Sequence, residues 1–293
     1  MRGQGIRTEE PKNRRTEFGS LVLRIFEFSR EGLVLQIRLG VELASLQLPL
    51  RQALLTAREL GVEAVEIDAR TQLRPEELSH TGVRQVRKML DDLNLRVSAV
   101  AFRTRRGYHI LEDLDVRLDA TRRAMKLAYD LGTNVLVNHV GRVPAEPDSP
   151  AFNTLVQALA DLGRYGQRVG AMLSAETGTE SGADLAGLIA RLPPGSIGVD
   201  FNPAGLILNG FSPREAIAAL APHVLHLHAI DATRDLALGR GMEVPLGQGN
   251  AELPEILAAL EEQQYRGYIT VARHDTQSPR ADIQQAIQFL RNL

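Results

Sequence analysis

The chain has 293 residues, of which 44% are hydrophobic and 24% are charged, a composition typical of a soluble globular protein with a substantial core. Its 34 lysines and arginines against 36 aspartates and glutamates give a formal charge of −2, so no general positive field attracts a nucleic-acid backbone. The absence of cysteine excludes disulfides, thiolate nucleophiles and cysteine-held metal centres, so any metal must be bound by His, Asp or Glu.

The first 32 residues differ from the rest of the chain because they mix basic and acidic side chains around one short apolar run, Leu21–Phe28. Arg24 and Glu27 interrupt this run, which is far too short to span a bilayer. We therefore expect residues 1–32 to be a flexible leader and the protein to be cytoplasmic, with no membrane partner.

From residue 35 onward, short aliphatic runs alternate with longer amphipathic stretches, which is typical of repeated βα units. The predicted strands are Leu35–Leu43, Ala64–Asp68, Val97–Phe102, Val135–His139, Met172–Glu176, Ile197–Asp200, Val224–His228 and Tyr268–Ala272. The predicted helices are Leu50–Leu60, Thr81–Leu93, Leu114–Leu131, Phe152–Val169, Ala183–Arg191, Pro213–Leu220, Leu253–Gln263 and Ala281–Leu290. Eight units in this length predict a single α/β domain, a (β/α)8 TIM barrel over residues 33–293.

Helix boundary signals support this assignment. Gly61 and Gly132 follow predicted helices, and Ser212 before Pro213 provides an N-cap with proline at the first helical position.

Polar residues end several of the predicted strands, where a barrel opens to solvent and binds substrates. Glu176, Asp200 and His228 end the fifth, sixth and seventh strands, and Asn138 and His139 end the fourth. Taken singly, such a carboxylate can cap a helix and such a histidine can be a hydrogen-bonded core residue. Together they would leave unbalanced charge unless a cation or a cationic substrate neutralises them.

His226 lies two residues before His228 and so points the same way, one layer deeper in the barrel. We expect it to pack inside an interior that is otherwise filled with aliphatic side chains, and the alternative is that it supports a metal ligand from behind.

Six segments occur in a characteristic order along the barrel: "ARELGVEAVEI", "LAYDLGTNVLVNHVG", "SAETG", "GVDFNP", "VLHLHAID" and "PLGQGNAELPEILAALEEQQYRGYITVAR". With them the chain resembles the xylose isomerase-like superfamily, which includes sugar isomerases, sugar-phosphate epimerases, inosose dehydratases and type IV apurinic endonucleases. The last segment is the most specific, and the resemblance covers nearly the whole barrel.

The resemblance implies that Glu176, Asp200 and His228 match metal ligands of the isomerases and epimerases, with Mn, Mg, Co or Zn as the divalent ion. In those relatives a glutamate at the end of the eighth strand is a fourth ligand and one of two acid/base carboxylates. Ala272 stands at that position here and can neither bind a metal nor move a proton.

Three accounts fit the replacement at Ala272. A neighbour such as His274, Asp275 or Glu243 takes over, a one-base mechanism uses Glu176 alone, or the barrel binds its ligand without chemistry. The catalytic candidates are therefore Glu176, His274 and Asp275.

Two loops carry candidate substrate-binding residues in addition to Asn138 and His139. The segment "RTRRGYH" after the third strand includes Arg103, and the long glycine-containing loop after the seventh strand includes Asp231 and Arg240. Arginines at a barrel mouth suit a phosphate or carboxylate, and a long loop can serve as a lid, although solvated loop charges are the ordinary interpretation.

The function that the sequence favours is a divalent-metal-dependent isomerase or epimerase of a sugar, sugar acid or sugar phosphate, with a small carbohydrate as its partner. A catalytically degenerate sugar-binding barrel is the alternative. An apurinic endonuclease is disfavoured because Asp200-Phe201-Asn202-Pro203 lacks an Asp-x-x-His pair and because the chain has no tryptophan or basic excess. Homo-oligomerisation is left open.

Overall fold

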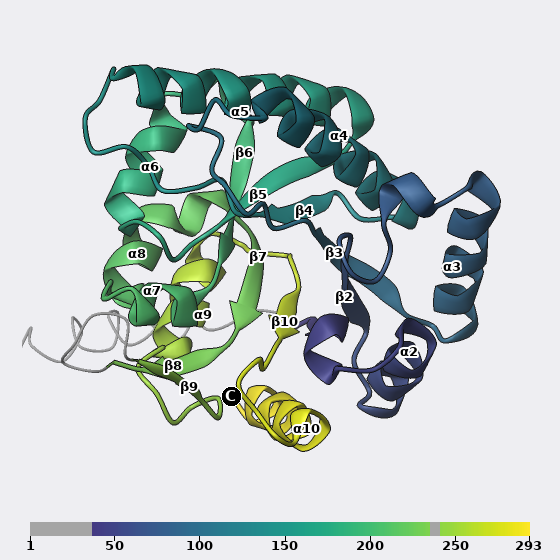
Figure 1. Cartoon of the computed structure of the whole chain (residues 1–293). Coiled ribbons are helices and arrows are strands. Elements are labelled where there is room, and N and C mark those ends of the chain that lie inside the picture. The colour runs from purple at the N-terminus through teal and green to yellow at the C-terminus, as the bar shows by residue number, and fades with distance from the viewer. Residues whose placement is uncertain (1–36, 235–240) are drawn as a thin grey trace, which may run out of the picture. The chain divides into compact units, whose positions relative to one another are not determined.

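The computed structural model describes residues 37–234 and 241–293, so the predicted leader lies outside the described residues. Eight parallel strands close into a barrel in the order β1-β10-β7-β6-β5-β4-β3-β2, with helices around it (Figure 1), which confirms the predicted (β/α)8 fold. The strands are β1 (Leu39–Glu42), β2 (Ala64–Asp68), β3 (Arg96–Ala101), β4 (Val135–Asn138), β5 (Met172–Glu176), β6 (Ile197–Phe201), β7 (Val224–Ala229) and β10 (Ile269–Val271).

The outer layer consists of α-helices that follow the strands. They are α2 (Leu50–Glu59), α3 (His80–Asp92), α4 (Leu114–Leu131), α5 (Pro150–Val169), α6 (Gly182–Ala190), α7 (Pro203–Leu208), α8 (Pro213–Leu220), α9 (Leu253–Glu262) and α10 (Pro279–Arg291). The described residues also form three short 3-10 helices: η1 (Leu43–Leu46), η2 (Pro75–Glu77) and η3 (Ala221–His223). Among the described residues, no helix is both long and apolar enough to cross a membrane.

Local signals explain where the helices begin and end. The hydroxyls of four serines accept backbone N–H groups in the first turns of α3, α5, α6 and α8, and these caps are Ser79, Ser149, Ser181 and Ser212. At the end of α4, Gly132 has a φ of 89°, a conformation that is strained for residues with a Cβ atom.

The chain between β7 and α9 forms more structure than the predicted lid loop. β8 (Asp231–Thr233) pairs with β9 (Met242–Val244) as an antiparallel hairpin. The buried carboxylate of Asp231 accepts four backbone N–H groups, from Ala232, Gly247, Gly249 and Ala251. This side chain therefore fastens the hairpin to the segment that leads into α9.

The barrel interior is more polar than we expected. The Asp200 carboxylate lies 2.8 Å from Nδ1 of His226, whose Nε2 lies 2.7 Å from Oγ1 of Thr270, which in turn donates to Oγ of Ser98. All four side chains are buried, so the aliphatic interior predicted from the sequence is wrong at this level of the barrel. Each of these four side chains has a hydrogen-bond partner within the group, which offsets the cost of burying it.

The parallel register shifts at two points, between Val65 and Glu66 and between Val199 and Asp200. Such irregularities re-aim the side chain that follows them. Both of the re-aimed residues, Glu66 and Asp200, carry carboxylates that belong to the site described below.

Candidate active site

Four buried carboxylates converge at the mouth of the barrel. Glu42 and Glu66 are register partners on β1 and β2, and Glu176 and Asp200 are register partners on β5 and β6. None of them is more than 9% exposed. Because buried carboxylates of like charge repel one another, the site is stable only with cationic groups among them.

The guanidinium of Arg103, from the loop after β3, is the main counter-charge. Its Nε donates to Oε2 of Glu176 at 2.6 Å, while its two terminal nitrogens donate to Glu42 at 3.1 Å and to Glu66 at 3.4 Å. In the strand order, β1 lies four places from β5 in either direction. Arg103 therefore joins Glu42 and Glu176 from opposite sides of the barrel.

Glu176 is held by polar groups on both of its oxygens. Asn202 donates to Oε1 at 2.9 Å, and Nε2 of His139 lies 3.0 Å from Oε2. Burial alone would raise the pKa of Glu176, but the charge of Arg103 and the hydrogen bond from His139 hold the pKa well below its usual range. Glu176 is therefore an ionised carboxylate.

The two histidines of β7 surround Asp200. Nδ1 of His228 lies 2.9 Å from both oxygens of Asp200, and its Nε2 lies 3.0 Å from Oε2 of Glu66. Burial would lower the pKa of His228, but the charges of Asp200 and Glu66 raise it well above its usual value. His226 is buried and its Nδ1 lies 2.8 Å from Asp200, so it both packs inside the barrel and orients Asp200 from below.

His274, from the segment that follows β10, forms a second charged group next to β1. Its Nδ1 lies 2.8 Å from Oε1 of Glu243, and its Nε2 lies 2.8 Å from Oε2 of Glu42. Burial would lower the pKa of His274, but the hydrogen bonds to Glu243 and Glu42 raise it to about 10. The imidazole is therefore protonated near neutral pH and can donate a proton but cannot act as a free base.

The structure brings the three predicted metal ligands together. Oxygen or nitrogen atoms of Glu176, Asp200 and His228 all lie within 4.8 Å of one another. A second group within the same limit consists of Glu66, His226 and His228. Nε2 of His228 and Oε2 of Glu66 are also buried atoms without an aligned hydrogen bond. This donor set of oxygens and imidazole nitrogen suits a divalent ion of the Mn, Mg, Co or Zn type.

The surroundings of Ala272 are apolar. Its side chain is 4% exposed and packs in a small apolar cluster with Ala204, Ile207, Ile230, Ala232 and Ala251. Val41 of β1 pairs with Val271 of β10, so Glu42 and Ala272 are the next residues of two neighbouring strands.

The remaining predicted site residues have varied surroundings. Asn138 donates to the Phe102 carbonyl at 2.6 Å and accepts from Tyr108, and with these bonds it holds the loop after β3. The oxygens of Asp231 are taken by backbone N–H groups, so its geometry is that of a structural residue and does not match the substrate-binding role we predicted. The exposed carboxylate of Asp275 makes no hydrogen bond or ion pair within the described ranges, and Arg240 lies outside them.

Sequence reasoning missed Glu42 and Glu66 because only residues at the predicted strand ends were considered. Glu42 falls inside the predicted run Leu35–Leu43, and Glu66 is the middle residue of Ala64–Asp68. The signal that could have found both is a carboxylate within an otherwise aliphatic strand, where burial requires a partner.

Comparisons with known proteins agree with this architecture. The family model described as xylose isomerase-like TIM barrel matches residues 54–293. A xylose isomerase domain protein from Planctomyces limnophilus is 25% identical, with a TM-score of 0.77 over 87% of this chain and 96% of that chain. No curated protein matches the sequence.

Two further solved structures share the fold at lower identity. A xylose isomerase-like TIM barrel protein from Mycobacterium smegmatis in complex with magnesium is 17% identical, with a TM-score of 0.70 over 87% of this chain and 95% of that chain. A D-tagatose 3-epimerase-like protein is 18% identical, with a TM-score of 0.71 over 87% and 96% of the two chains.

Proposed function

The chain belongs to the xylose isomerase-like TIM barrel family, and we propose that it is a divalent-cation-dependent epimerase or isomerase of a small sugar or sugar acid. One observation carries this proposal: the carboxylates of Glu176 and Glu42 face each other from opposite sides of the barrel mouth, beside a group of oxygen and nitrogen ligands. The likeness to a D-tagatose 3-epimerase-like protein supports the reaction class.

Epimerisation needs a proton to leave one face of a carbon and a proton to return to the other face. Glu176 is the base in this scheme because its carboxylate is ionised and lies at the end of β5. On the side of the barrel mouth opposite Glu176, the carboxylate of Glu42 accepts a hydrogen bond from the protonated imidazole of His274. This imidazole can supply a proton on that side. The pair of Glu42 and His274 thereby takes the place of the carboxylate that is absent at Ala272.

Arg103 lies between the two proton-transfer groups. Its guanidinium can stabilise the negative charge that develops on a substrate oxygen as the proton leaves carbon. His139, which lies 3.0 Å from Glu176 and is about half exposed, borders the same space and can orient a substrate hydroxyl.

Glu176, Asp200 and His228 would hold the divalent cation. When bound, such a cation polarises a carbonyl and binds adjacent hydroxyls. The similar fold solved in complex with magnesium supports this part of the proposal. Within the protein, His226 and Thr270 keep Asp200 oriented for the role.

The test is hydrogen exchange at carbon. The protein, supplied with Mn²⁺, is incubated in D₂O with a panel of ketoses and sugar acids, and deuterium incorporation and epimer formation are followed by NMR. The proposal predicts both signals for at least one compound and their loss, by about 100-fold or more, in Glu176→Gln. The exposed Glu63→Gln, on the opposite end of β2, is the matched control and should keep the wild-type rate.

A binding barrel without chemistry is the second candidate, and the contacts of Arg103 favour it. The guanidinium fills part of the space between Glu42, Glu66 and Glu176, where a substrate carbon would have to enter. Under this alternative a sugar binds at the mouth, as calorimetry would detect, while no compound of the panel gains deuterium.

A further inference from the structure

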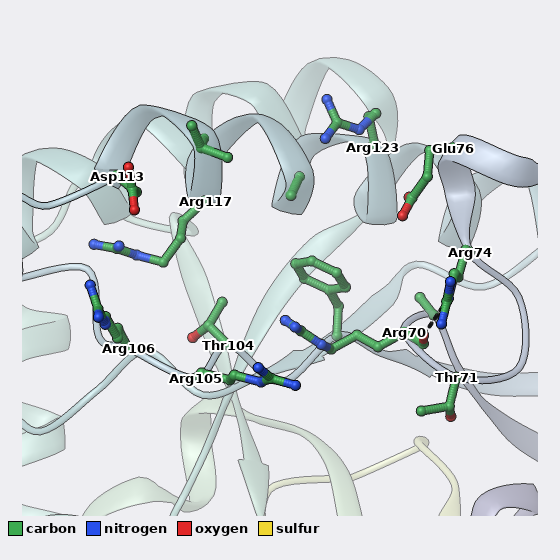
Figure 2. A pocket seen from close by; sticks show the side chains of 14 residues that line it. Arg70, Thr71, Arg74, Glu76, Thr104, Arg105, Arg106, Asp113, Arg117 and Arg123 are labelled. Atoms are coloured by element: carbon green, nitrogen blue, oxygen red, sulfur yellow. Dashed lines mark hydrogen bonds between the residues drawn. The ribbon is translucent and has the colours of Figure 1, made fainter.

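Outside the barrel mouth, the loops after β2 and β3 and the first half of α4 enclose a cavity of about 700 Å³ (Figure 2). Arginines from three separate segments line it, namely Arg70, Arg74, Arg105, Arg106, Arg117 and Arg123. The acidic lining residues are Glu76 and Asp113. Six positive and two negative side chains give this lining an excess of four positive charges, in a chain whose formal charge is −2.

Several of these arginines have no carboxylate partner. Arg105 and Arg123 form no ion pair or hydrogen bond with the described residues. Arg117 donates to the main-chain carbonyls of Gly107 and Ile110, and its Nε is buried without a hydrogen-bond partner. Arg70 donates to the Arg103 carbonyl at 3.3 Å, so its charge also stays unneutralised.

The other two arginines are neutralised from outside the cavity. Arg74 pairs with Glu77 at 2.9 Å and Arg106 with Glu112 at 2.5 Å, and neither of these carboxylates belongs to the lining. Four guanidinium groups without carboxylate partners around one cavity repel one another, and an anion in the cavity would relieve this repulsion.

The cavity also has an apolar wall. The guanidinium carbon of Arg70 lies 5.3 Å from the centre of the Phe102 ring, and Val116 and Ala120 of α4 belong to the same lining. In Figure 2 the side chains of Arg70 and Arg105 extend toward the middle of the cavity beneath α4. Positively charged guanidinium groups beside an apolar wall suit a ligand in which an anionic group is attached to an uncharged organic moiety.

We propose that this cavity is a binding site for a phosphorylated small molecule, separate from the proton-transfer site. A phosphoryl group offers three anionic oxygens, which guanidinium groups from three directions can bind at once, whereas a carboxylate has two oxygens in one plane. None of the carboxylates or histidines of the barrel mouth lines the cavity. The site therefore binds its ligand whether or not the mouth performs chemistry.

Calorimetry on the full chain, freed of metals on a chelating resin, tests the proposal with inorganic pyrophosphate as the probe. Wild type should bind it, with affinity that falls as salt is raised. Arg105→Ala should weaken binding roughly tenfold and the double variant Arg70→Ala with Arg105→Ala further, because each removes charge-assisted hydrogen bonds. Arg105→Lys should retain an intermediate affinity because it keeps the charge but loses the planar fork.

Two controls separate this site from the mouth and from general surface charge. Arg87→Ala removes an exposed arginine of α3 that does not line the cavity, and it should bind pyrophosphate as wild type does. Glu176→Gln alters the mouth and should also bind it unchanged. If a hexose 6-phosphate binds more tightly than inorganic phosphate and the free hexose does not bind, the sugar moiety contributes to binding at this site together with the phosphate.

Three results would overturn the proposal: no binding of pyrophosphate to wild type, equal binding by wild type and the double arginine variant, or loss of binding in Glu176→Gln. The last result would place the anion in the mouth. Thermal unfolding of each variant without ligand shows whether the substitution has left the fold intact, and Arg105 is exposed, so its removal leaves the core unchanged.

Discussion

Nε2 of His228 lies 3.0 Å from Oε2 of Glu66, and both atoms are buried without an aligned hydrogen bond. The carboxylates around His228 raise its pKa well above the usual value, so the imidazole carries a proton near neutral pH. A metal binds only the neutral imidazole, so metal and proton compete for this side chain.

We therefore expect the affinity for Mn²⁺ to increase as the pH rises above 6.5, the ordinary pKa of histidine, with release of protons on binding. Calorimetry in buffers of different ionisation enthalpy measures both quantities. Asp200→Asn should weaken metal retention strongly, while Asp91→Asn, an exposed position on α3, should not. Affinity that does not depend on pH, without proton release, would show that His228 is not a ligand.

Arg103→Ala should destabilise the protein because it leaves Glu42, Glu66 and Glu176 buried without their shared counter-charge. Removing one partner of a buried ion pair costs roughly 3 kcal/mol. Unfolding in urea measures the loss, and Mn²⁺ should restore more stability to the variant than to wild type, since a divalent cation can replace the missing charge. Arg51→Ala, at an exposed position of α2, is the control. Wild-type stability of Arg103→Ala in the absence of metal would contradict the assigned role of the guanidinium.

Glu42→Gln distinguishes a two-sided from a one-sided reaction. If Glu176 removes the proton and the group around Glu42 returns one to the opposite face, the variant should still exchange deuterium into the substrate from the Glu176 side. Its rate of epimer formation should fall by about 100-fold. NMR in D₂O reports both rates in one experiment. Equal losses of exchange and epimerisation would assign Glu42 to binding and not to proton return.

His274 should make stability depend on pH in a defined window. Its folded pKa of about 10 lies above the ordinary value of 6.5, so the folded state binds more protons between these two values. The stabilisation is complete below about pH 6.5 and is lost as the pH rises toward about 10.

Urea-unfolding midpoints should therefore fall across this window in wild type and fall less in His274→Gln. His80→Gln, which changes an exposed histidine of α3, serves as the control and should follow wild type. Parallel pH profiles for His274→Gln and wild type would show that the contacts with Glu42 and Glu243 do not stabilise the protonated imidazole.

The alternation of aliphatic runs and amphipathic stretches was enough to predict the barrel. The predicted bounds of β2, β5, α4 and α8 agree with the structure. Gly132 marks the end of α4, and Ser212 with Pro213 marks the start of α8. The short helix α7 was missed although Asn202 and Pro203 are an N-cap and a first-turn proline, since six residues are too few to show a period.

The site was predictable only in part. Glu176 ends its strand, and Asp200 and His228 are the second-last residues of theirs, so their position in the sequence indicates the barrel mouth. The contacts of Arg103 depend on the path of a loop, and a local pattern does not contain that path. Asp231 shows the converse case, because a carboxylate that follows a strand has the same sequence signal whether it binds a ligand or four backbone N–H groups.

The adjacency of Glu42 and Ala272 on neighbouring strands has a consequence for how such sites diverge. In a closed barrel of parallel strands, register partners on neighbouring strands point to the same side of the sheet, so their side chains lie close together. An acidic group can then disappear from one strand and reappear on the next while the centre keeps its charge. An alignment that compares related barrels strand by strand can therefore miss a retained function. Comparing the side chains of register partners around the whole barrel is the better guide to common ancestry.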